Sequence, residues 1–304
     1  MIKTKEKKYI LSLDIGGTKI GVGLINQFGK IVKLKKIATP KSTDSRQMQS
    51  FILKLIYQEW QDGIAKIGIG FAGQISWPDG KIINSPNIKS LIGVNLKKYL
   101  TSKLKIPVYI DNDVHCFTLA ESVFGVGQKY NYVIGLAIGT GVGGGIVINN
   151  KIIRGADNSA GEFGHMKITT GGRKCSCGKL SHLESYISGQ AMTSIFYQLS
   201  GKTADAFQIE KLYNRRNKHA RKTFTIMSQY SAIGLANIIN TLNPEIIVIG
   251  GGISRVKAIW KVTLKKYLPQ YLFYQDLKNT KIVISQLQDQ AIILGAALIT
   301  TENY

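Results

Sequence analysis

The sequence predicts an α/β protein made of two related domains, and three observations support this prediction. Strand-like apolar runs alternate with helix-like periodic segments along the chain. Residues 13–26 (LDIGGTKIGVGLIN) and residues 136–149 (LAIGTGVGGGIVIN) align with one another without a gap, which indicates a short internal repeat. The length of 304 residues suits two domains better than one.

Each copy of the repeat is typical of a β-hairpin, with a β-branched strand, a Gly/Thr turn and a second strand. The alignment places Gly16 on Gly139 and Asn26 on Asn149. Because each copy opens one half of the chain, we expect two related α/β domains that face each other. We place the first domain in residues 1–116 plus 290–304 and the second in residues 117–289.

The other elements follow from apolar periodicity and from turn residues. Further strands are predicted at residues 31–38, 64–71, 108–110, 246–249 and 282–285. Helices are predicted around residues 48–56, 115–123, 224–242 and 290–300. Small residues in the terminal helix, Gly295-Ala296-Ala297, would allow close packing against a neighbouring strand or the nucleotide.

Composition limits the classes of function. No segment approaches the roughly 20 unbroken apolar residues that span a bilayer, and the N-terminus lacks the pattern of a signal peptide. We therefore expect a cytoplasmic protein without a membrane partner. The net charge of +22 is compatible with nucleic-acid binding, but the scattered lysines favour a solvated basic surface. Three cysteines argue against a disulfide framework.

Glycine-rich turns point to phosphate binding. Residues 14–19 (DIGGTK) and 139–145 (GTGVGGG) would let backbone N–H groups approach phosphate oxygens, and Asp14 offers a carboxylate to Mg²⁺. An ordinary hairpin turn is the alternative. Neither turn precedes GKS or GKT or opens a helix as GxGxxG, which argues against a Walker A loop and a Rossmann site. Gly250-Gly251-Gly252 is either a platform for adenosine or a plain turn.

Asp111-Asn112-Asp113 follows a predicted strand and precedes a predicted helix. Phosphoryl transfer to an alcohol benefits from a carboxylate that accepts the hydroxyl proton, and the carboxyl end of a strand suits that role. Asp113 is equally suited to capping the helix, so the motif alone leaves both roles open. We interpret His115 and Cys116 as cleft-edge or core residues, since no third residue is evident to orient them.

Four potential metal ligands lie close together in the sequence: His165, Cys175, Cys177 and His182. Two cysteines and two histidines are sufficient for a tetrahedral zinc site, although the spacing is not that of DNA-reading zinc fingers. A pair of ordinary loop thiols is the alternative. Glu162 and Glu184 flank this set and offer hydrogen-bond acceptors to sugar hydroxyls, with solvated surface charge as the alternative.

Together these motifs resemble the ROK family. The motifs DIGGTK, DND, IGTGVGGG, GEFGH and CSCGKLSHLE occur in the family's order and at its usual intervals, from about Tyr9 to the terminal helix. The resemblance implies two actin-like (ribonuclease H-like) α/β domains with a nucleotide and sugar cleft between them. It also implies a kinase that transfers the γ-phosphoryl group of ATP to the 6-hydroxyl of a hexose.

The resemblance also assigns roles by position. Asp113 is similar to the base that deprotonates the sugar hydroxyl. Sugar contacts are implied for Gly73, Asn87, Asn112, Asp113, Glu162, His165 and Glu184. Contacts to ATP and catalytic Mg²⁺ are implied for Asp14, Gly16, Gly17, Thr18, Lys19, Gly139, Thr140, Gly141 and Gly251. Structural Zn²⁺ is implied at His165, Cys175, Cys177 and His182, where His182 replaces the family's usual cysteine.

Glucose is the expected acceptor, with N-acetylglucosamine or N-acetylmannosamine second and fructose third.

The family also contains repressors that carry a helix-turn-helix domain ahead of the sugar domain. Only eight residues precede the first predicted strand here, so we expect a kinase and no nucleic-acid partner. A third class is a sugar-sensing protein with an inactive kinase site. The presence of both Asp14 and Asp113 argues against this class. The resemblance favours a homodimer, and ATP or polyphosphate remain open as donors.

Overall fold

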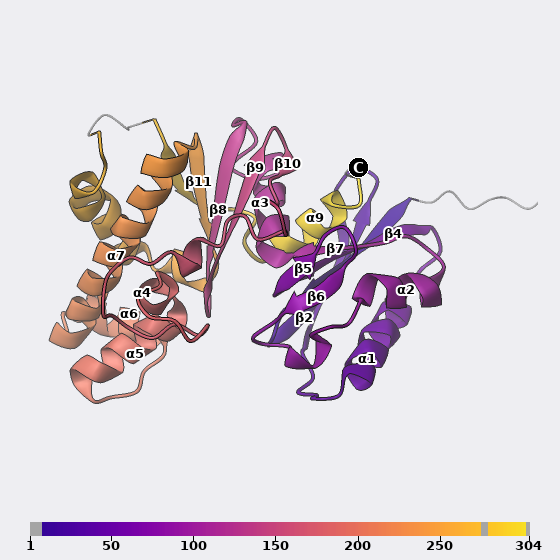
Figure 1. The fold of residues 1–304 in the computed structure, drawn as a ribbon, viewed down its shortest axis with the longest axis horizontal. Helices are drawn as coiled ribbons and strands as arrows, with labels where there is room; N and C mark the ends of the chain where they lie inside the picture. The colour runs from indigo at the N-terminus through magenta and orange to yellow at the C-terminus, as the bar shows by residue number, and fades with distance from the viewer. Residues whose placement is uncertain (1–7, 275–278, 302–304) are drawn as a thin grey trace, which may run out of the picture. The chain divides into compact units, whose positions relative to one another are not determined.

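The computed structural model describes residues 8–274 and 279–301, which form a mixed α/β protein with two five-stranded sheets (Figure 1). The chain divides into two compact units. Unit 1 contains the described residues up to Gly125, the segment Ile146–Ala160 and the residues from Asp289 onward. Unit 2 contains Val126–Gly145 and Gly161–Gln288. The parts of the predicted domains at 1–7, 275–278 and 302–304 lie outside the described residues.

The first sheet has the strand order β3-β2-β1-β4-β7. Its strands are β1 (Tyr9–Ile15), β2 (Lys19–Asn26), β3 (Ile31–Ala38), β4 (Ile64–Phe71) and β7 (Val108–Asn112). The first three strands form an antiparallel meander, and β4 and β7 run parallel to β1. A separate two-stranded sheet pairs β5 (Gln74–Ser76) with β6 (Lys81–Asn84).

The second sheet has the order β10-β9-β8-β11-β12. Its strands are β8 (Tyr132–Ile138), β9 (Val142–Ile148), β10 (Lys151–Ile152), β11 (Ile246–Gly250) and β12 (Lys281–Ile284). Taken in chain order, both sheets follow the same plan, in which the first strand lies between the second and the fourth. The repeat seen in the sequence is therefore confirmed, because its copies form β1-β2 and β8-β9.

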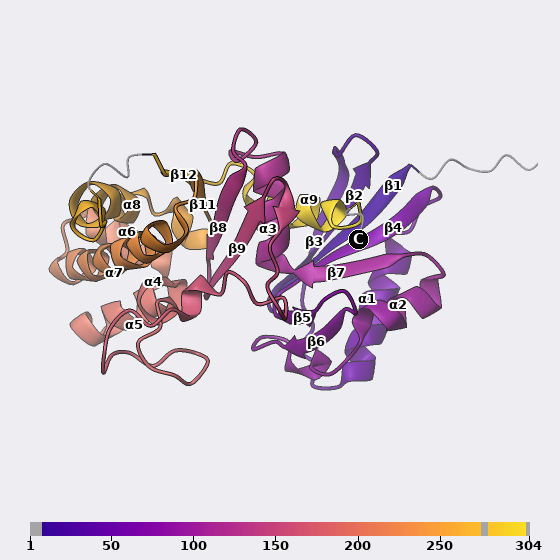
Figure 2. The same ribbon diagram turned by 45° about the horizontal axis from the view of Figure 1, so that its top comes forward.

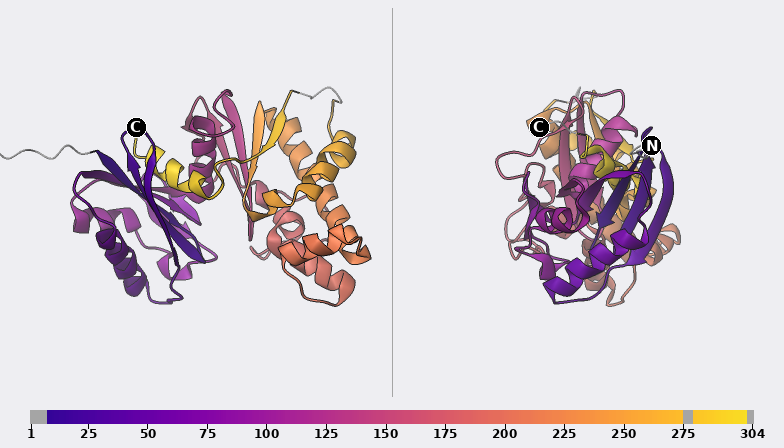
Figure 3. Two further views of the ribbon diagram at one scale, coloured as in Figure 1. Left: turned by 180° about the vertical axis from the view of Figure 1, so that it is seen from behind. Right: turned by 90° about the vertical axis from the view of Figure 1, so that its right-hand side faces the viewer.

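In unit 1, helices cover both faces of the first sheet (Figures 2 and 3). The helices are α1 (Ser45–Gln58), α2 (Leu96–Leu104), α3 (Asp113–Val123) and α9 (Ala291–Leu298). Buried side chains of α1 and α2 share one hydrophobic core with β1 and β4, whereas α9 packs against Ile25 on the other face. The helix predicted around residues 48–56 forms α1. It begins where the Asp44 side chain accepts a hydrogen bond from the Gln47 backbone N–H.

In unit 2, the helices are α4 (Glu184–Ile187), α5 (Gly189–Ser200), α6 (Ala206–Asn214), α7 (Lys218–Leu242) and α8 (Lys257–Val262). The helix predicted at 224–242 begins earlier, at Lys218, because the Asn217 side chain caps the first turn. Helix α7 contacts α4, α5, α6 and α8 and so forms the centre of this helical layer. No helix in the described ranges has both the length and the apolar character needed to span a membrane.

The predicted domains differ from the observed units at residues 117–125, at Asp289 and in one internal segment, all of which belong to unit 1. Ile146–Ala160 belongs to unit 1, although the prediction placed it in the second domain. The reason is a set of hydrogen bonds that reach Asp111 at the end of β7 from the side chains of Arg154 and Asn158. Side-chain contacts over such a sequence distance leave no periodic pattern in the sequence.

Close packing of α9 depends on two glycines, as the small residues of the terminal helix suggested. A Cβ atom on Gly295 would overlap the backbone carbonyl of Cys116 in α3. A Cβ atom on Gly68 in β4 would overlap the backbone carbonyl of Ala296 in α9. These backbones cannot move apart without opening the packed core on this face of the sheet.

We therefore expect Gly295→Ala to lower the free energy of unfolding by about 1–3 kcal/mol, the usual cost of overpacking. The loss should occur even though alanine has the higher intrinsic helix propensity. Chemical denaturation measures the change. Gly252→Ala is the matched control, because a Cβ atom there meets no atom within 4 Å. Equal stability of Gly295→Ala and the wild-type protein would contradict this prediction.

Candidate active site and metal centre

Acidic and polar residues meet at the carboxyl ends of three parallel strands in unit 1. In the sheet register, Asp14 of β1 lies beside Gly70 of β4, and Gly70 lies beside Asp111 of β7. The next row places Asn112 at the same edge, immediately before Asp113 opens α3. Because parallel strands end at one edge of their sheet, residues far apart in sequence form one site.

Asp14 is an acid at this edge whose protonation is strongly perturbed by its surroundings. Burial raises the pKa of its carboxyl to about 7, and the negative charge of Asp113 adds to the effect. The nearby Lys36 opposes the shift, while Asp289 supports it. A buried carboxylate beside a second acid is a suitable ligand for a divalent cation, which would offset the repulsion between them.

Asn112, not Asp113, is the residue that caps α3. The Asn112 side-chain oxygen accepts hydrogen bonds from the backbone N–H groups of Val114 (2.8 Å) and His115 (3.1 Å). Its Nδ2 donates to the carbonyl of Gly73 at 3.0 Å, which joins two of the predicted sugar-side residues. Asp113 occupies the first helical position, and its Oδ1 accepts the backbone N–H of Val114 in a bond of 3.0 Å.

The first glycine turn lies against another predicted sugar-side residue. The Gly16 backbone N–H donates to the carbonyl of Lys19 at 3.1 Å and closes the turn, while Thr18 and Lys19 are exposed. A Cβ atom on Gly17 would overlap the Cβ atom of Asn87. The sequence argument did not identify Thr39, whose hydroxyl donates to the Gly16 carbonyl at 2.6 Å and braces the turn.

The second glycine turn belongs to unit 2 and closes differently. The Gly139 N–H donates to the Gly141 carbonyl at 2.9 Å, and the Gly189 N–H donates to the Gly139 carbonyl at 2.8 Å. Thr140 is exposed at the tip of the turn. Gly251 follows the adjacent strand with φ +80°, and a Cβ atom there would overlap the carbonyl of Ile138.

Glu184 connects this turn to the cysteine-rich segment. Its Oε2 accepts the Val142 backbone N–H at 2.9 Å. Its Oε1 accepts the Ser176 hydroxyl at 2.5 Å and the Cys175 thiol at 3.5 Å. Both carboxylate oxygens therefore have partners in unit 2. Glu162, by contrast, is exposed and lies 3.9 Å from His165 Nε2 through its Oε2 atom.

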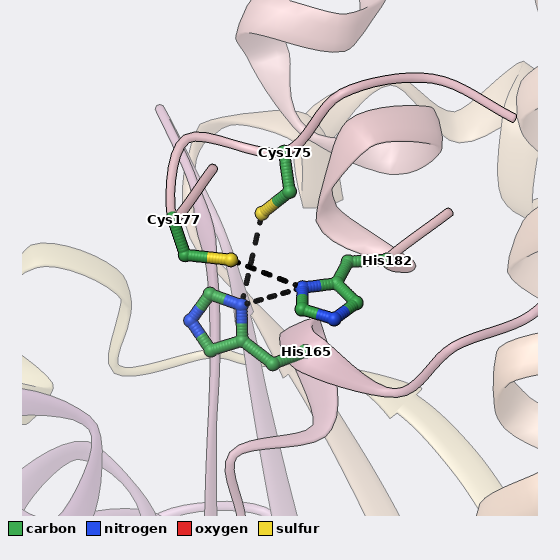
Figure 4. Close-up of side chains that lie close together, drawn as sticks. All are labelled: His165, Cys175, Cys177 and His182. Atoms are coloured by element: carbon green, nitrogen blue, oxygen red, sulfur yellow. Dashed lines mark hydrogen bonds between the residues drawn. The ribbon is translucent and has the colours of Figure 1, made fainter. Parts of the chain in front are cut away.

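The four candidate metal ligands converge on one point (Figure 4). The two Nδ1 atoms of His165 and His182 are 3.3 Å apart. Cys177 Sγ lies 3.2 Å from His182 Nδ1, and Cys175 Sγ lies 3.7 Å from His165 Nδ1. In a regular tetrahedron around zinc the nitrogen–nitrogen edge is about 3.3 Å and the nitrogen–sulfur edge about 3.6 Å. The donor set and its spacing fit a zinc ion.

Protonation of the cluster also agrees with metal ligation. Burial is the main cause that raises the pKa of the Cys175 thiol to about 11, so a metal must displace a proton there. Burial and the proximity of His165 lower the pKa of His182, which favours the neutral imidazole that binds metals.

A model of the ROK family matches residues 10–303. The chain belongs to this family. It is 31% identical to a glucokinase of Thermotoga maritima over 98% of both chains. It is also 31% identical to a xylose repressor of Caldicellulosiruptor bescii, over 96% of this chain and 77% of the repressor. A ROK glucokinase of Streptomyces griseus, solved with glucose and AMPPNP, superposes with a TM-score of 0.83 at 27% identity, over 96% of this chain and 98% of that one.

These similarities confirm the predicted fold class, two actin-like α/β domains. Family membership covers both sugar kinases and a repressor, so it does not by itself separate a catalyst from a regulator.

The raised pKa of Asp14 predicts a pH-dependent stability. A folded-state pKa near 7, above the ordinary value of 3.8, means that ionisation destabilises the fold as pH rises through 7. Asp14→Asn mimics the neutral acid, so at pH 8 it should be more stable than the wild type by roughly 1–4 kcal/mol.

The difference between variant and wild type should shrink as the pH falls from 7 towards 3.8, the pKa of the unfolded state, because the folded Asp14 becomes neutral first. Urea unfolding without divalent cations, at pH 8 and pH 5.5, measures it. Asp44→Asn, at the N-cap of α1, is a matched control with an exposed acid. A stability difference for Asp14→Asn that does not change with pH would contradict the raised pKa.

Proposed function

We propose that this protein is a hexose kinase that transfers the γ-phosphoryl group of Mg-ATP to the 6-hydroxyl of a hexose. The observation that supports this most directly is the row of strand ends in unit 1, which brings Asp14 and Asp113 to one edge. Glycine turns at the corresponding edge of each sheet supply backbone N–H groups suited to phosphates. The glucokinase relatives support glucose as the first acceptor, with N-acetylhexosamines and fructose as alternatives.

Asp113 is proposed as the base that accepts the proton of the attacking hydroxyl. Its place at the first position of α3 fixes its backbone, while Asn112 takes the capping role. The start of α3 is therefore closed by Asn112 and does not depend on the Asp113 carboxylate. A carboxylate positioned in this way aligns the hydroxyl and stabilises its developing positive charge during transfer.

Gly16, Gly17, Thr18 and Lys19 from unit 1 and Gly139, Thr140, Gly141 and Gly251 from unit 2 are proposed to bind the nucleotide. Asp14 is proposed to hold the Mg²⁺ that accompanies ATP, which neutralises charge on the transferred group. Turns without side chains let backbone N–H groups donate to phosphate oxygens without steric conflict.

The acceptor sugar is proposed to contact Gly73, Asn87, Asn112, Glu162, His165 and Glu184, together with the base. Asn112 and Gly73 are already joined by a hydrogen bond, and Glu184 is already held by the second glycine turn. Such fixed donors and acceptors reduce the entropy lost when a sugar binds. The homodimer implied by the resemblance stays a prediction.

Structural zinc is proposed at His165, Cys175, Cys177 and His182. The ion would cross-link the GEFGH segment to the CSCGKLSHLE segment, and the second of these supplies Glu184. Glu184 already ties the second segment to the glycine turn, through its hydrogen bonds to the Ser176 hydroxyl and the Val142 backbone N–H.

A coupled assay for ADP release tests the proposed function. It should be run with ATP or polyphosphate against glucose, mannose, fructose, N-acetylglucosamine and N-acetylmannosamine. Turnover that depends on one hexose supports the proposal and ranks the acceptors. Sugar binding without turnover would contradict it and favour a sensor, and sequence-specific, salt-sensitive DNA binding would favour a regulator.

Asp113→Asn should lower kcat by about 10²–10⁴-fold, the range for general acid–base catalysis, while hexose binding changes little. Steady-state kinetics and calorimetric titration with the hexose measure the two effects. Asp157→Asn, in an exposed loop of the same unit, is the control that should retain wild-type kinetics. A kcat of Asp113→Asn within a few-fold of wild type would disprove the assignment of the base.

The metal centre should bind one zinc ion per chain, which elemental analysis of the purified protein measures. Titration of the metal-free protein with zinc near pH 7 should release about two protons, because both thiols bind as thiolates. Cys177→Ser and His182→Ala should each weaken binding by at least about 100-fold, while Cys116→Ser, on the buried face of α3, should keep the metal. Zinc retained at wild-type affinity in His182→Ala would exclude His182 as a ligand.

A further inference from the structure

A buried ionic network surrounds Asp111, a residue to which the proposed mechanism gives no role. Its side chain is fully buried, and its carboxylate accepts five hydrogen bonds. Oδ1 accepts from the Asn112 backbone N–H (2.7 Å), His115 Nδ1 (3.1 Å) and Asn158 Nδ2 (2.9 Å). Oδ2 accepts from Arg154 through Nε (2.9 Å) and Nη2 (2.8 Å). A fully desolvated carboxylate needs such partners to remain charged.

His115 is placed between two acceptors. Its Nδ1 faces Asp111 Oδ1, and its Nε2 lies 3.2 Å from the carbonyl oxygen of Ala160. A neutral imidazole has one donor and can satisfy only one of these acceptors, whereas an imidazolium donates to both. Burial alone would lower the pKa of His115, but the hydrogen bond and charge of Asp111 outweigh it and hold the pKa above its ordinary value.

The network contains two cations and one anion. Arg154 is nearly buried, with its guanidinium 3.9 Å from the ring centroid of Trp77, so the ring covers a face that water would otherwise solvate. Burial tends to raise the pKa of Asp111, but His115 and then Arg154 keep it lowered. The charged groups packed against His115 are thus Asp111, which favours its protonation, and Arg154, which opposes it.

The network joins the segments that carry the proposed acceptor residues. Asp111 precedes Asn112 and Asp113, and Asn112 holds the carbonyl of Gly73. Asn158 Nδ2 also donates to the carbonyl of Ile75 at 3.0 Å. Ala160, held by His115, is the last residue of unit 1 before the chain enters Gly161 and Glu162 of unit 2.

We propose that His115, as an imidazolium between Asp111 and the Ala160 carbonyl, is a positioning residue for the hexose side of the reaction. Through Asp111 it positions the adjacent Asn112-Asp113, and through the Ala160 carbonyl it positions the segment that leads to Glu162. This inference rests on the proposed kinase function. The hydrogen bonds described above join Asp111 to the segments of the proposed hexose residues, so loss of the network should weaken use of the hexose and leave Mg-ATP binding unchanged.

Nitrogen NMR of the whole protein tests the charge state directly. The chain has four histidines, so His115→Phe assigns the His115 signals by their loss. Both ring nitrogens of His115 should show the shifts of an imidazolium at pH 7.5. A neutral ring at that pH would overturn the proposal.

Kinetics test the positioning role. His115→Phe and, as a second variant, Arg154→Gln should raise the KM for the hexose by about 10-fold or more while the KM for Mg-ATP stays within about two-fold. Leu55→Ala, on the buried face of α1, is the control for lost stability and should change neither constant at a temperature where it stays folded. Hexose KM values within about two-fold of wild type in both variants, or an equal rise in both constants, would overturn the proposal.

The two proposals fail in different ways. If the wild-type protein turns over no sugar, the proposed function fails, and hexose affinity measured by calorimetry replaces KM in the same comparison. Weaker hexose binding by His115→Phe together with a charged His115 would still support the positioning role. Unchanged hexose binding would overturn it.

Discussion

The site depends above all on the parallel register of β1, β4 and β7. One buried row, Leu13, Ile69 and Ile110, crosses the three strands and leaves no room for an alternative pairing. The next row places Asp14, Gly70 and Asp111 side by side. A slip of one residue would exchange the two faces of a strand, burying polar side chains and exposing apolar ones. The packing of apolar side chains in the core therefore fixes the strand register, and the register fixes where the acidic residues lie.

A glycine in β4 is required for close packing at the same edge of the sheet. A Cβ atom on Gly70 would collide with Ile292, so glycine lets α9 lie close against β4 beside the acids. Unit 2 uses the same sheet plan with a different turn. Its hairpin closes between Gly139 and Gly141, and Glu184 rather than a threonine hydroxyl braces it. One topology thus supports an acidic edge in unit 1 and a glycine-lined edge beside the Cys/His cluster in unit 2.

Local patterns predicted the elements well because each depends on neighbours in the sequence. The strand at 64–71 forms β4 with the predicted bounds, and the hairpin repeat forms both sheet openings. The clustering of His165, Cys175, Cys177 and His182 was predictable because the four lie within one short stretch of chain. By contrast, His115 was interpreted only as a cleft-edge or core residue, and Arg154 and Asn158 were not singled out. Their common partner, Asp111, lies on a distant strand, and no periodicity marks such a contact.

The amino-acid sequence by itself determined the α/β class, the repeated hairpin, the family and the residue types available for chemistry, since these follow from apolar spacing, turn residues and motif order. Tertiary structure decided that Asn112 and not Asp113 caps α3, which carboxylate is buried among cations and which unit holds residues 146–160. The physical reason is that a charge inside a protein is tolerated only beside its partners, and those partners come together only when the strands pair and the helices pack.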